Sequence, residues 1–207
     1  MRLTWHNGFV DKKLLERLYL RDKKSAHDIA RSIKCSDGRI NYWLAKHAIA
    51  KRSISDAVYV RSNPSGDPFR FRQPRTHRAL LLFGLGLGLY WGEGSKRSLS
   101  QVRLGNTDPH LVRMFVSFLR QLYCADPAKL RFALQIFTDM DQGKEERFWQ
   151  TFLKVSPKQF YKTINTRSGS IGTYREKSQH GVLTVYFNNK RLRDLLLQEI
   201  EKIKELR

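Results

Sequence analysis

The fold of this chain is decided by residues 79–94, A-L-L-L-F-G-L-G-L-G-L-Y-W-G-E-G. The run is apolar on every side and predicts a helix, although each internal glycine costs a helix about 1 kcal/mol relative to alanine. Gly84, Gly88 and Gly92 recur every four residues and therefore share one helix face. A face without side chains lets a second helix approach almost backbone to backbone, with the acidic Glu93 at its end.

Two simpler interpretations explain less of this run. A membrane span needs about 20 apolar residues, whereas this run stops at Trp91 with Arg78 and Glu93 close by. An ordinary buried core helix explains the leucines, but it explains neither the glycine spacing nor the acid that follows. We therefore expect a helix that packs against a second helix through its glycines.

The end of the run, G-L-G-L-Y-W-G-E-G, resembles the LAGLIDADG motif of homing endonucleases. On this alignment Gly88 and Gly92 take the motif's small packing positions and Glu93 takes its metal-binding acid. The sequence departs from the motif at Gly86, which replaces a leucine, and at Trp91, which replaces an aspartate. The motif occurs once in the chain, and in this family a single motif implies a homodimer that acts on a roughly palindromic target.

The resemblance also implies a metal site at the seam between two such helices. Metal ions held by carboxylates stabilise the charge on the attacking and leaving oxygens of a phosphodiester, and Mg²⁺ takes one or two protein carboxylates. One Glu93 per chain cannot build such a site alone, so two copies must meet. The implied metal-binding residues are Glu93 and Gly92, the implied dimer interface is Gly84, Gly88, Leu89 and Gly92, and the implied catalytic residues are Glu93, Lys96, Lys162 and Lys177.

The composition points to a nucleic-acid partner. The 207 residues carry 39 Lys and Arg against 19 Asp and Glu, which gives a net charge of +20. Such a charge favours phosphate backbones, and the sequence lacks a lysine-rich amphipathic membrane helix. Cys35 and Cys124 are isolated, so we expect neither a disulfide framework nor a zinc site. We expect a cytoplasmic protein, because no secretion signal is evident, without membrane contact or a small-molecule cofactor.

Residues 11–47 predict three short helices in a first domain over residues 1–52. The pattern I-A-x-x-I-K-C-S-x-x-x-I-x-x-x-L, which begins at Ile29, resembles a helix-turn-helix. It departs from such motifs at Lys34, where glycine is common, so the turn must hold a strained lysine or take another shape. The second helix of the motif would read bases through Arg39, Asn41 and Tyr42. The alternative is a three-helix module that binds another protein.

Residues 53–77 predict a flexible basic linker that contains Pro64, Pro68 and Pro74. Its arginines would follow the phosphates of a duplex, and the alternative is a solvated run of charge. The linker residues assigned to DNA are Arg70, Arg72 and Arg75.

Residues 78–207 predict an α+β domain of the LAGLIDADG type, an antiparallel four-stranded saddle backed by helices. We expect strands at residues 101–105 and 130–137 and a pair formed by residues 160–165 and 182–187. An extra helix near residues 108–123 separates the first two strands, which departs from the family's usual order. In the family the concave face lies along the major groove, which assigns to DNA the residues Arg103, Arg131, Gln135, Lys162, Thr184 and Tyr186, with a basic loop around Arg167, Arg175 and Lys177.

We therefore expect a metal-dependent, site-specific endonuclease that binds double-stranded DNA as a homodimer and uses an N-terminal helix-turn-helix for recognition. One alternative is a transcriptional regulator that keeps this fold without cleaving DNA. Another is an RNA-splicing maturase that uses the same basic surface on intron RNA. The retained Glu93 favours cleavage over regulation.

Overall fold

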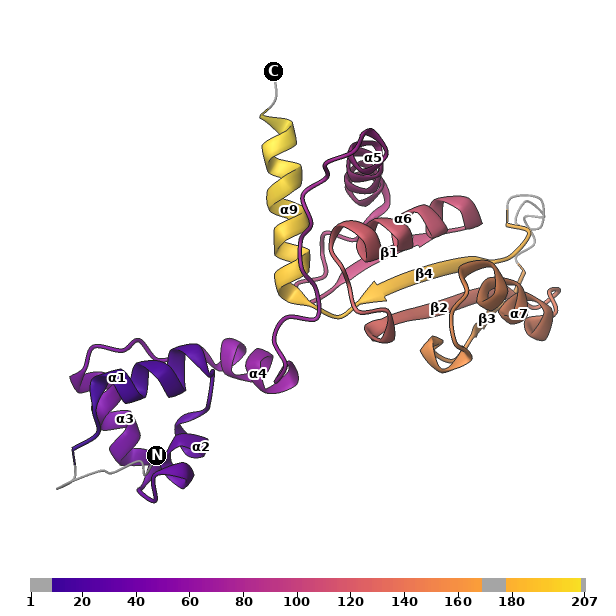
Figure 1. Cartoon of the computed structure of the whole chain (residues 1–207). Coiled ribbons are helices and arrows are strands. Elements are labelled where there is room, and N and C mark those ends of the chain that lie inside the picture. The colour runs from indigo at the N-terminus through magenta and orange to yellow at the C-terminus, as the bar shows by residue number, and fades with distance from the viewer. Residues whose placement is uncertain (1–8, 169–177, 206–207) are drawn as a thin grey trace. The chain divides into compact units, whose positions relative to one another are not determined.

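The computed structural model describes residues 9–168 and 178–205, which form two compact units that divide between Gly66 and Asp67 (Figure 1). Helices form the first unit, and helices with a four-stranded sheet form the second. This confirms the α+β fold class. No helix among the described residues is both long enough and apolar enough to cross a membrane.

The regular elements of the first unit are helices throughout its described residues, 9–66. Helix α1 (Lys12–Leu15) continues as a π-helical turn, η1 (Glu16–Arg21), and is followed by α2 (Ala26–Ser32) and α3 (Asp37–Lys46). A further helix, α4 (Ile54–Ser62), completes the unit. The three helices expected over residues 11–47 are confirmed. Their apolar stripes meet in one core, which comprises Val10, Leu15, Leu18, Tyr19, Ile29, Ala30, Ile33, Ile40, Trp43, Leu44 and Ile49.

The turn between α2 and α3 holds a lysine in a strained conformation. The N–H of Cys35 donates to the carbonyl of Ala30 (2.9 Å), which closes a Schellman motif at the end of α2. That motif places its next-to-last residue in the left-handed region, and Lys34 stands there with φ of 55°. A left-handed conformation costs an L-residue about 1–2 kcal/mol. The sequence left open a strained lysine or a turn of another shape, and the structure has the strained lysine.

The segment predicted as a flexible linker is largely ordered. Helix α4 lies within it and is capped by Ser53, whose hydroxyl accepts from the N–H of Asp56 (3.0 Å). Further along, the N–H groups of Arg70 and Arg72 donate to the carbonyls of Tyr123 (2.8 Å) and Leu122 (2.6 Å). The prediction of a flexible coil over residues 53–77 is therefore wrong, because these backbone hydrogen bonds fix residues 70 and 72 to the second unit.

The second unit alternates helices and strands around one sheet. Its elements are α5 (His77–Glu93), β1 (Val102–Asn106), α6 (Pro109–Leu122), η2 (Pro127–Lys129), β2 (Leu130–Phe137), α7 (Gln142–Leu153), η3 (Pro157–Gln159), β3 (Ile164–Thr166), β4 (Val182–Phe187) and α9 (Lys190–Lys204). Helix α6 packs against α5, β1, β4 and α7, and α9 packs against α5 and β1 (Figure 1).

The strand order differs from the expected antiparallel saddle. The strands lie in the order β1-β4-β2-β3, with β4 antiparallel to both of its neighbours and β2 parallel to β3. The expected pair between residues 160–165 and 182–187 is wrong, since β3 and β4 do not pair. Helix α7 connects β2 to β3, and a helical crossover returns the chain in the same direction. The sheet is therefore mixed.

The two faces of the sheet differ in burial as the alternation predicts. One face packs under the helices, and its fully buried members are Val102, Leu104, Leu130, Phe132, Leu134, Ile136, Leu183, Val185 and Phe187. Strand β4 occupies the centre because these buried residues match on both sides: Val185 lies opposite Leu104 on β1 and opposite Phe132 on β2. The other face is polar and basic.

The strained turn generates a stability prediction. Replacing Lys34 by glycine should stabilise α2 and α3 by about 0.5–1 kcal/mol, because glycine adopts positive φ at no steric cost. The protection of the Ile33 and Ile40 amides against hydrogen exchange would measure the gain. Lys24→Gly is the matched control, since Lys24 has ordinary backbone geometry and glycine there only adds freedom to the unfolded chain. Equal protection in both variants would contradict the prediction.

Candidate functional site

The uncovered face of the sheet carries a row of cations around an aromatic ring. Arg103 on β1 and Arg131 on β2 both lie opposite Tyr186 on the central strand β4. The Arg103 guanidinium sits over the Tyr186 ring, with its carbon 5.4 Å from the ring centroid. Arg131 donates through Nη1 to the carbonyls of Ala128 (2.6 Å) and Leu130 (2.9 Å). The row is thus held in place by contacts on its own sheet and on η2, the turn that precedes β2.

Other residues assigned to this face lie in neighbouring rows. Thr184 stands between Gly105 and Ala133, one row further along the sheet. Gln135 follows in the next row on β2, and its amide donates to the Thr166 hydroxyl on β3 (3.0 Å).

An aromatic neighbour of the row was not found from the sequence. Tyr161 packs edge-on against Tyr186, with ring centroids 5.7 Å apart, and its N–H donates to the carbonyl of Phe132 (2.8 Å).

The exposed Lys162 follows Tyr161 at the β3 edge, and Arg167 is exposed just after β3. Arg175 and Lys177, also assigned to DNA, lie outside the described residues. The uncovered face therefore combines aromatic rings with positive charge, which is a typical composition for contact with nucleic acid.

The glycines of α5 divide between two faces of the helix. A Cβ at Gly86 would overlap the Phe118 ring on α6, so Gly86 gives α5 its close approach within the subunit. At Gly84, Gly88 and Gly92, an added Cβ would meet no atom within 4 Å among the described residues. The helix thus uses one glycine for its own core and presents the other three as an open strip, which we call the glycine face.

Large apolar side chains border the glycine face. Leu81 and Leu85 are each 53% exposed, and Trp91 is 44% exposed. Leu81 and Leu85 also line a groove of about 360 Å³ between α5 and α6, where Met114 stands on the opposite wall. Leu89, predicted at the dimer interface, is instead half-buried and packs against the core of its own subunit. The exposure of Leu81 and Leu85 beside the glycine face was not predicted from the sequence.

Glu93 stands where the glycine face meets the sheet. Its neighbour Gly94 pairs with Leu104 on β1, and the N–H of Ser95 donates to the carbonyl of Arg103 (2.9 Å). Gly94 must be glycine, because a Cβ there would overlap the carbonyl oxygen of Tyr90. Glu93 itself is exposed. The end of α5 is thus joined to the strand that carries Arg103, and the carboxylate lies at this junction.

The lysines assigned to catalysis do not gather around Glu93. Lys96 is close in the chain, but its ammonium donates to the carbonyl of Trp91 at the end of α5. Lys162 lies at the β3 edge, four strand positions from Gly94, which is on the order of 19 Å. Lys177 lies outside the described residues. Within the described ranges no three His, Cys, Asp or Glu side chains are grouped to hold a metal ion.

The loop after Glu93 is anchored to α9. Arg193 donates through Nη2 to the carbonyl of Lys96 (3.1 Å) and through Nη1 to the carboxylate of Asp194 (2.7 Å). Partial burial alone would raise the pKa of the Asp194 carboxyl, but hydrogen bonds from Lys190 and Arg193 outweigh burial and lower it. Beneath the loop, burial raises the pKa of the Tyr90 hydroxyl. The loop that follows Glu93 therefore has a fixed support.

In the first unit, the outer face of α3 is basic and aromatic. Arg39 and Tyr42 are exposed there, and Lys46 donates to the Tyr42 hydroxyl (3.4 Å) and lies 4.9 Å from the Trp43 ring centroid. Asn41 is half-buried, and its amide donates to the carbonyl of Asp37 (3.0 Å). Lys46 was not predicted as part of this surface, although its spacing from Arg39 and Tyr42 in the sequence places it on the same helix face.

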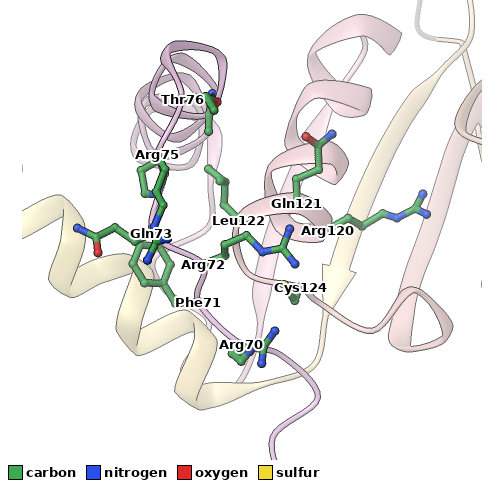
Figure 2. Close-up of a pocket in the computed structure, with 12 residues that line it drawn as sticks. Arg70, Phe71, Arg72, Gln73, Arg75, Thr76, Arg120, Gln121, Leu122 and Cys124 are labelled. Carbon is green, nitrogen blue, oxygen red and sulfur yellow. Dashed lines mark hydrogen bonds between the residues drawn. The ribbon is translucent and has the colours of Figure 1, made fainter.

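The three arginines assigned to the linker line a cleft in the second unit. Arg70, Arg72 and Arg75 lie on the segment that leads into the N-terminus of α5, and Arg120 at the C-terminal end of α6 also lines this cleft (Figure 2).

The two kinds of glycine in α5 generate opposite stability predictions. Gly86→Ala should destabilise the second unit by about 2 kcal/mol, because the added methyl overlaps the buried Phe118 ring. Gly84→Ala on the same helix is the control, and it should stabilise the unit by up to about 1 kcal/mol. Urea unfolding at low protein concentration would measure both. Similar effects of the two substitutions would show that the faces of α5 are wrongly assigned.

No protein-family model matches the chain, and neither a curated protein nor a solved structure matches it.

Proposed function

We propose that the protein is a homodimeric, metal-dependent DNA endonuclease of the LAGLIDADG type. The observation that carries the proposal is the junction at Gly94, which pairs with Leu104. This junction joins an exposed glycine face to the strand of a basic sheet face and leaves the exposed Glu93 between them. A dimer seam, a DNA-binding surface and an acid thus meet at one point.

The uncovered sheet face is the proposed surface for duplex DNA. Arg103 and Arg131 flank Tyr186 across three adjacent strands, so their charges span about 10 Å. Arginine binds phosphate oxygens with two parallel hydrogen bonds. A row of this width can contact the backbone of one duplex, and the net charge of +20 provides the long-range attraction.

The glycine face is the proposed contact between two copies. Gly84, Gly88 and Gly92 are unobstructed, so the matching face of a second α5 can approach closely. The exposed Leu81 and Leu85 would then be buried from water on both sides. A two-fold contact of this kind repeats each residue on both partners. With the two-fold axis running along the paired helices, as the resemblance to the LAGLIDADG family implies, two Glu93 carboxylates come to the same end of the seam.

A divalent metal fits this arrangement only in a dimer. Each subunit offers the Glu93 carboxylate and the carbonyl of Gly92, which lies in the last turn of α5, where carbonyls lack intrahelical donors. Mg²⁺ accepts such oxygens together with water and substrate phosphate. When bound, it would stabilise the charge that develops on the attacking and leaving oxygens. Glu93 would bind the metal ion, and Arg193 fixes the loop beside it through the carbonyl of Lys96.

Helix α3 is proposed to add sequence recognition, as in a helix-turn-helix. Its exposed Arg39 and Tyr42 lie in the first two turns, where recognition helices contact base edges. Lys46 on the same face suits a phosphate contact. The amide of Asn41 donates within its own helix, so we assign it the smaller part in reading bases.

A transcriptional regulator that does not cleave DNA is the second candidate. The observation that favours it is the position of Lys96, whose ammonium donates to the carbonyl of Trp91 and is not paired with the Glu93 carboxylate. Such a protein would keep the glycine face and the basic sheet for binding.

Removing the two cations of the row tests the DNA surface. Arg103→Gln with Arg131→Gln should weaken binding to a fluorescent DNA duplex at least tenfold, and the slope of log affinity against log salt should fall by about 2, since each phosphate contact contributes about 0.9. The control is Lys144→Gln with Arg147→Gln on α7, which removes the same charge from exposed positions. If both double variants bind alike, general charge and not this row holds the duplex.

Glu93→Gln tests cleavage. With DNA from the surroundings of its own gene, the variant should cut at least a hundredfold more slowly in Mg²⁺, because a metal-held charge supplies several kcal/mol to such a reaction. Duplex affinity should stay within twofold, and Glu205→Gln, an exposed acid at the end of α9, should cut normally. An undiminished rate would remove Glu93 from the mechanism.

A substitution at Gly88 tests formation of the dimer independently of the folding of the subunit. Gly88→Leu should convert the protein to a monomer in sedimentation while leaving its urea unfolding at low protein concentration unweakened, because an added Cβ there meets no atom of the described residues within 4 Å outside the backbone of its own helix. Wild-type protein that dimerises and binds duplex tightly but never cuts, with any divalent metal, would favour the regulator.

A further inference from the structure

A cleft of about 780 Å³ opens between the segment that leads into α5 and the C-terminal end of α6 (Figure 2). Among the described residues that line it, none is acidic and four are arginines: Arg70, Arg72, Arg75 and Arg120. The cleft also has one large aromatic wall residue, Phe71, and one cysteine, Cys124. Its chemistry is that of a receptor for anions.

The arginines stand on a backbone that is fixed in place. The N–H of Arg70 donates to Tyr123 (2.8 Å), that of Arg72 donates to Leu122 (2.6 Å), and the carbonyl of Pro68 accepts from Asp126 (2.8 Å). An extended backbone directs alternate side chains to one side, about 7 Å apart. Figure 2 shows Arg70 and Arg72 reaching toward the same side, beside Cys124. This spacing is comparable to that of successive phosphates along a nucleic-acid strand.

The charges in the cleft have no partner among the described residues of the chain. No hydrogen bond or ion pair joins the side chains of Arg70, Arg72, Arg75 or Arg120 to any residue in the ranges 9–168 and 178–205. The nearby Asp67 is paired with Arg191 on α9 (3.0 Å). Like charges on one side of a segment repel one another, so an anion that binds there gains from the guanidinium groups of both Arg70 and Arg72.

Phe71 offers a surface for a base on the other side of this segment, opposite Arg70 and Arg72 (Figure 2). It is 40% exposed, although its ring packs against Tyr123 (5.2 Å between centroids) and Phe83 (5.9 Å). An aromatic ring that is held rigidly and half uncovered beside cations is the arrangement on which bases of single strands stack. Neither charge nor this ring requires a particular base.

The cleft lies on the helical side of the sheet. Helix α6 packs on the buried face of β1 and β4, whereas Arg103 and Arg131 project from the opposite face. A duplex on the uncovered face is therefore separated from the cleft by the sheet itself. The cleft is also too small for a duplex, which is about 20 Å wide including its grooves.

We propose that this cleft binds a single nucleic-acid strand, with successive phosphates on Arg70 and Arg72, and that a base of the same strand reaches across the segment to stack on Phe71. The inference rests on the proposed function, because it requires that the protein binds nucleic acid. It adds a second site, which binds a single strand outside the duplex. A nuclease with such a site can hold a frayed or cut end of its substrate. A free polyphosphate is the other ligand that would present successive phosphates to these arginines.

The test uses the full chain with Arg70→Gln and Arg72→Gln. A fluorescent oligo-dT strand should bind this variant at least tenfold more weakly, with a salt slope lower by about 1.4, since a single strand releases about 0.7 ions per phosphate. Duplex affinity should change less than twofold. Lys144→Gln with Arg147→Gln is again the control for charge alone.

Cys124 gives a second readout that does not depend on activity. In a Cys35→Ser chain it is the sole cysteine, so oligo-dT should slow its alkylation in the wild-type cleft but not in the double variant. Duplex DNA at equal phosphate concentration should leave the rate unchanged. Inorganic pyrophosphate should protect Cys124 less than the strand does.

The outcomes separate the two proposals. Undiminished binding of oligo-dT by the double variant, or equal losses for strand and duplex, overturns the single-strand cleft while leaving duplex binding on the sheet intact. Pyrophosphate that protects Cys124 without any protection by the strand overturns it in favour of free phosphate compounds. Wild-type protein that binds neither duplex nor strand overturns the proposed function itself.

Discussion

The close packing of Gly86 against Phe118 sets the orientation of α5, and the other features of the second unit follow from it. A helix that approaches α6 at this glycine turns Leu87 and Tyr90 into the core. The same rotation directs Gly84, Gly88 and Gly92 away from the subunit. One missing side chain inside the core therefore decides which side of the helix stays available to a partner, and where Glu93 stands relative to β1.

Most of the secondary structure follows from patterns that depend on neighbours in the chain. The alternation of Leu130, Phe132, Leu134 and Ile136 predicts β2 with its inward face, and the structure buries those four residues. The strand order does not follow in this way, because β4 pairs with β1 and β2 through contacts between distant segments. The short β3 has no burial signal of its own, since Ile164 and Asn165 are both exposed. Its parallel pairing therefore could not be read from the sequence.

The candidate site was predictable where it depends on one element and not where it depends on several. The glycine spacing marked the open face of α5, and alternation placed Arg103 and Tyr186 on the same face of the sheet. The flexible linker was a wrong prediction, because prolines signal a break in periodicity and say nothing of the backbone bonds that tie residues 70 and 72 to α6. Helix α4 was missed for a related reason: Ile54 and Val58 are exposed, so its apolar residues show no buried stripe.

The central position of β4 has a consequence for how the molecule is made. Strand β1 is synthesised early, yet its partner lies at residues 182–187, near the end of the chain. At about 5–20 residues per second, a nascent chain waits on the order of several seconds with the β1 edge unpaired. The exposed Leu81 and Leu85 of α5 are present on the same unfinished chain. Ribosomal pausing between these two segments would lengthen the time during which unfinished copies can associate wrongly.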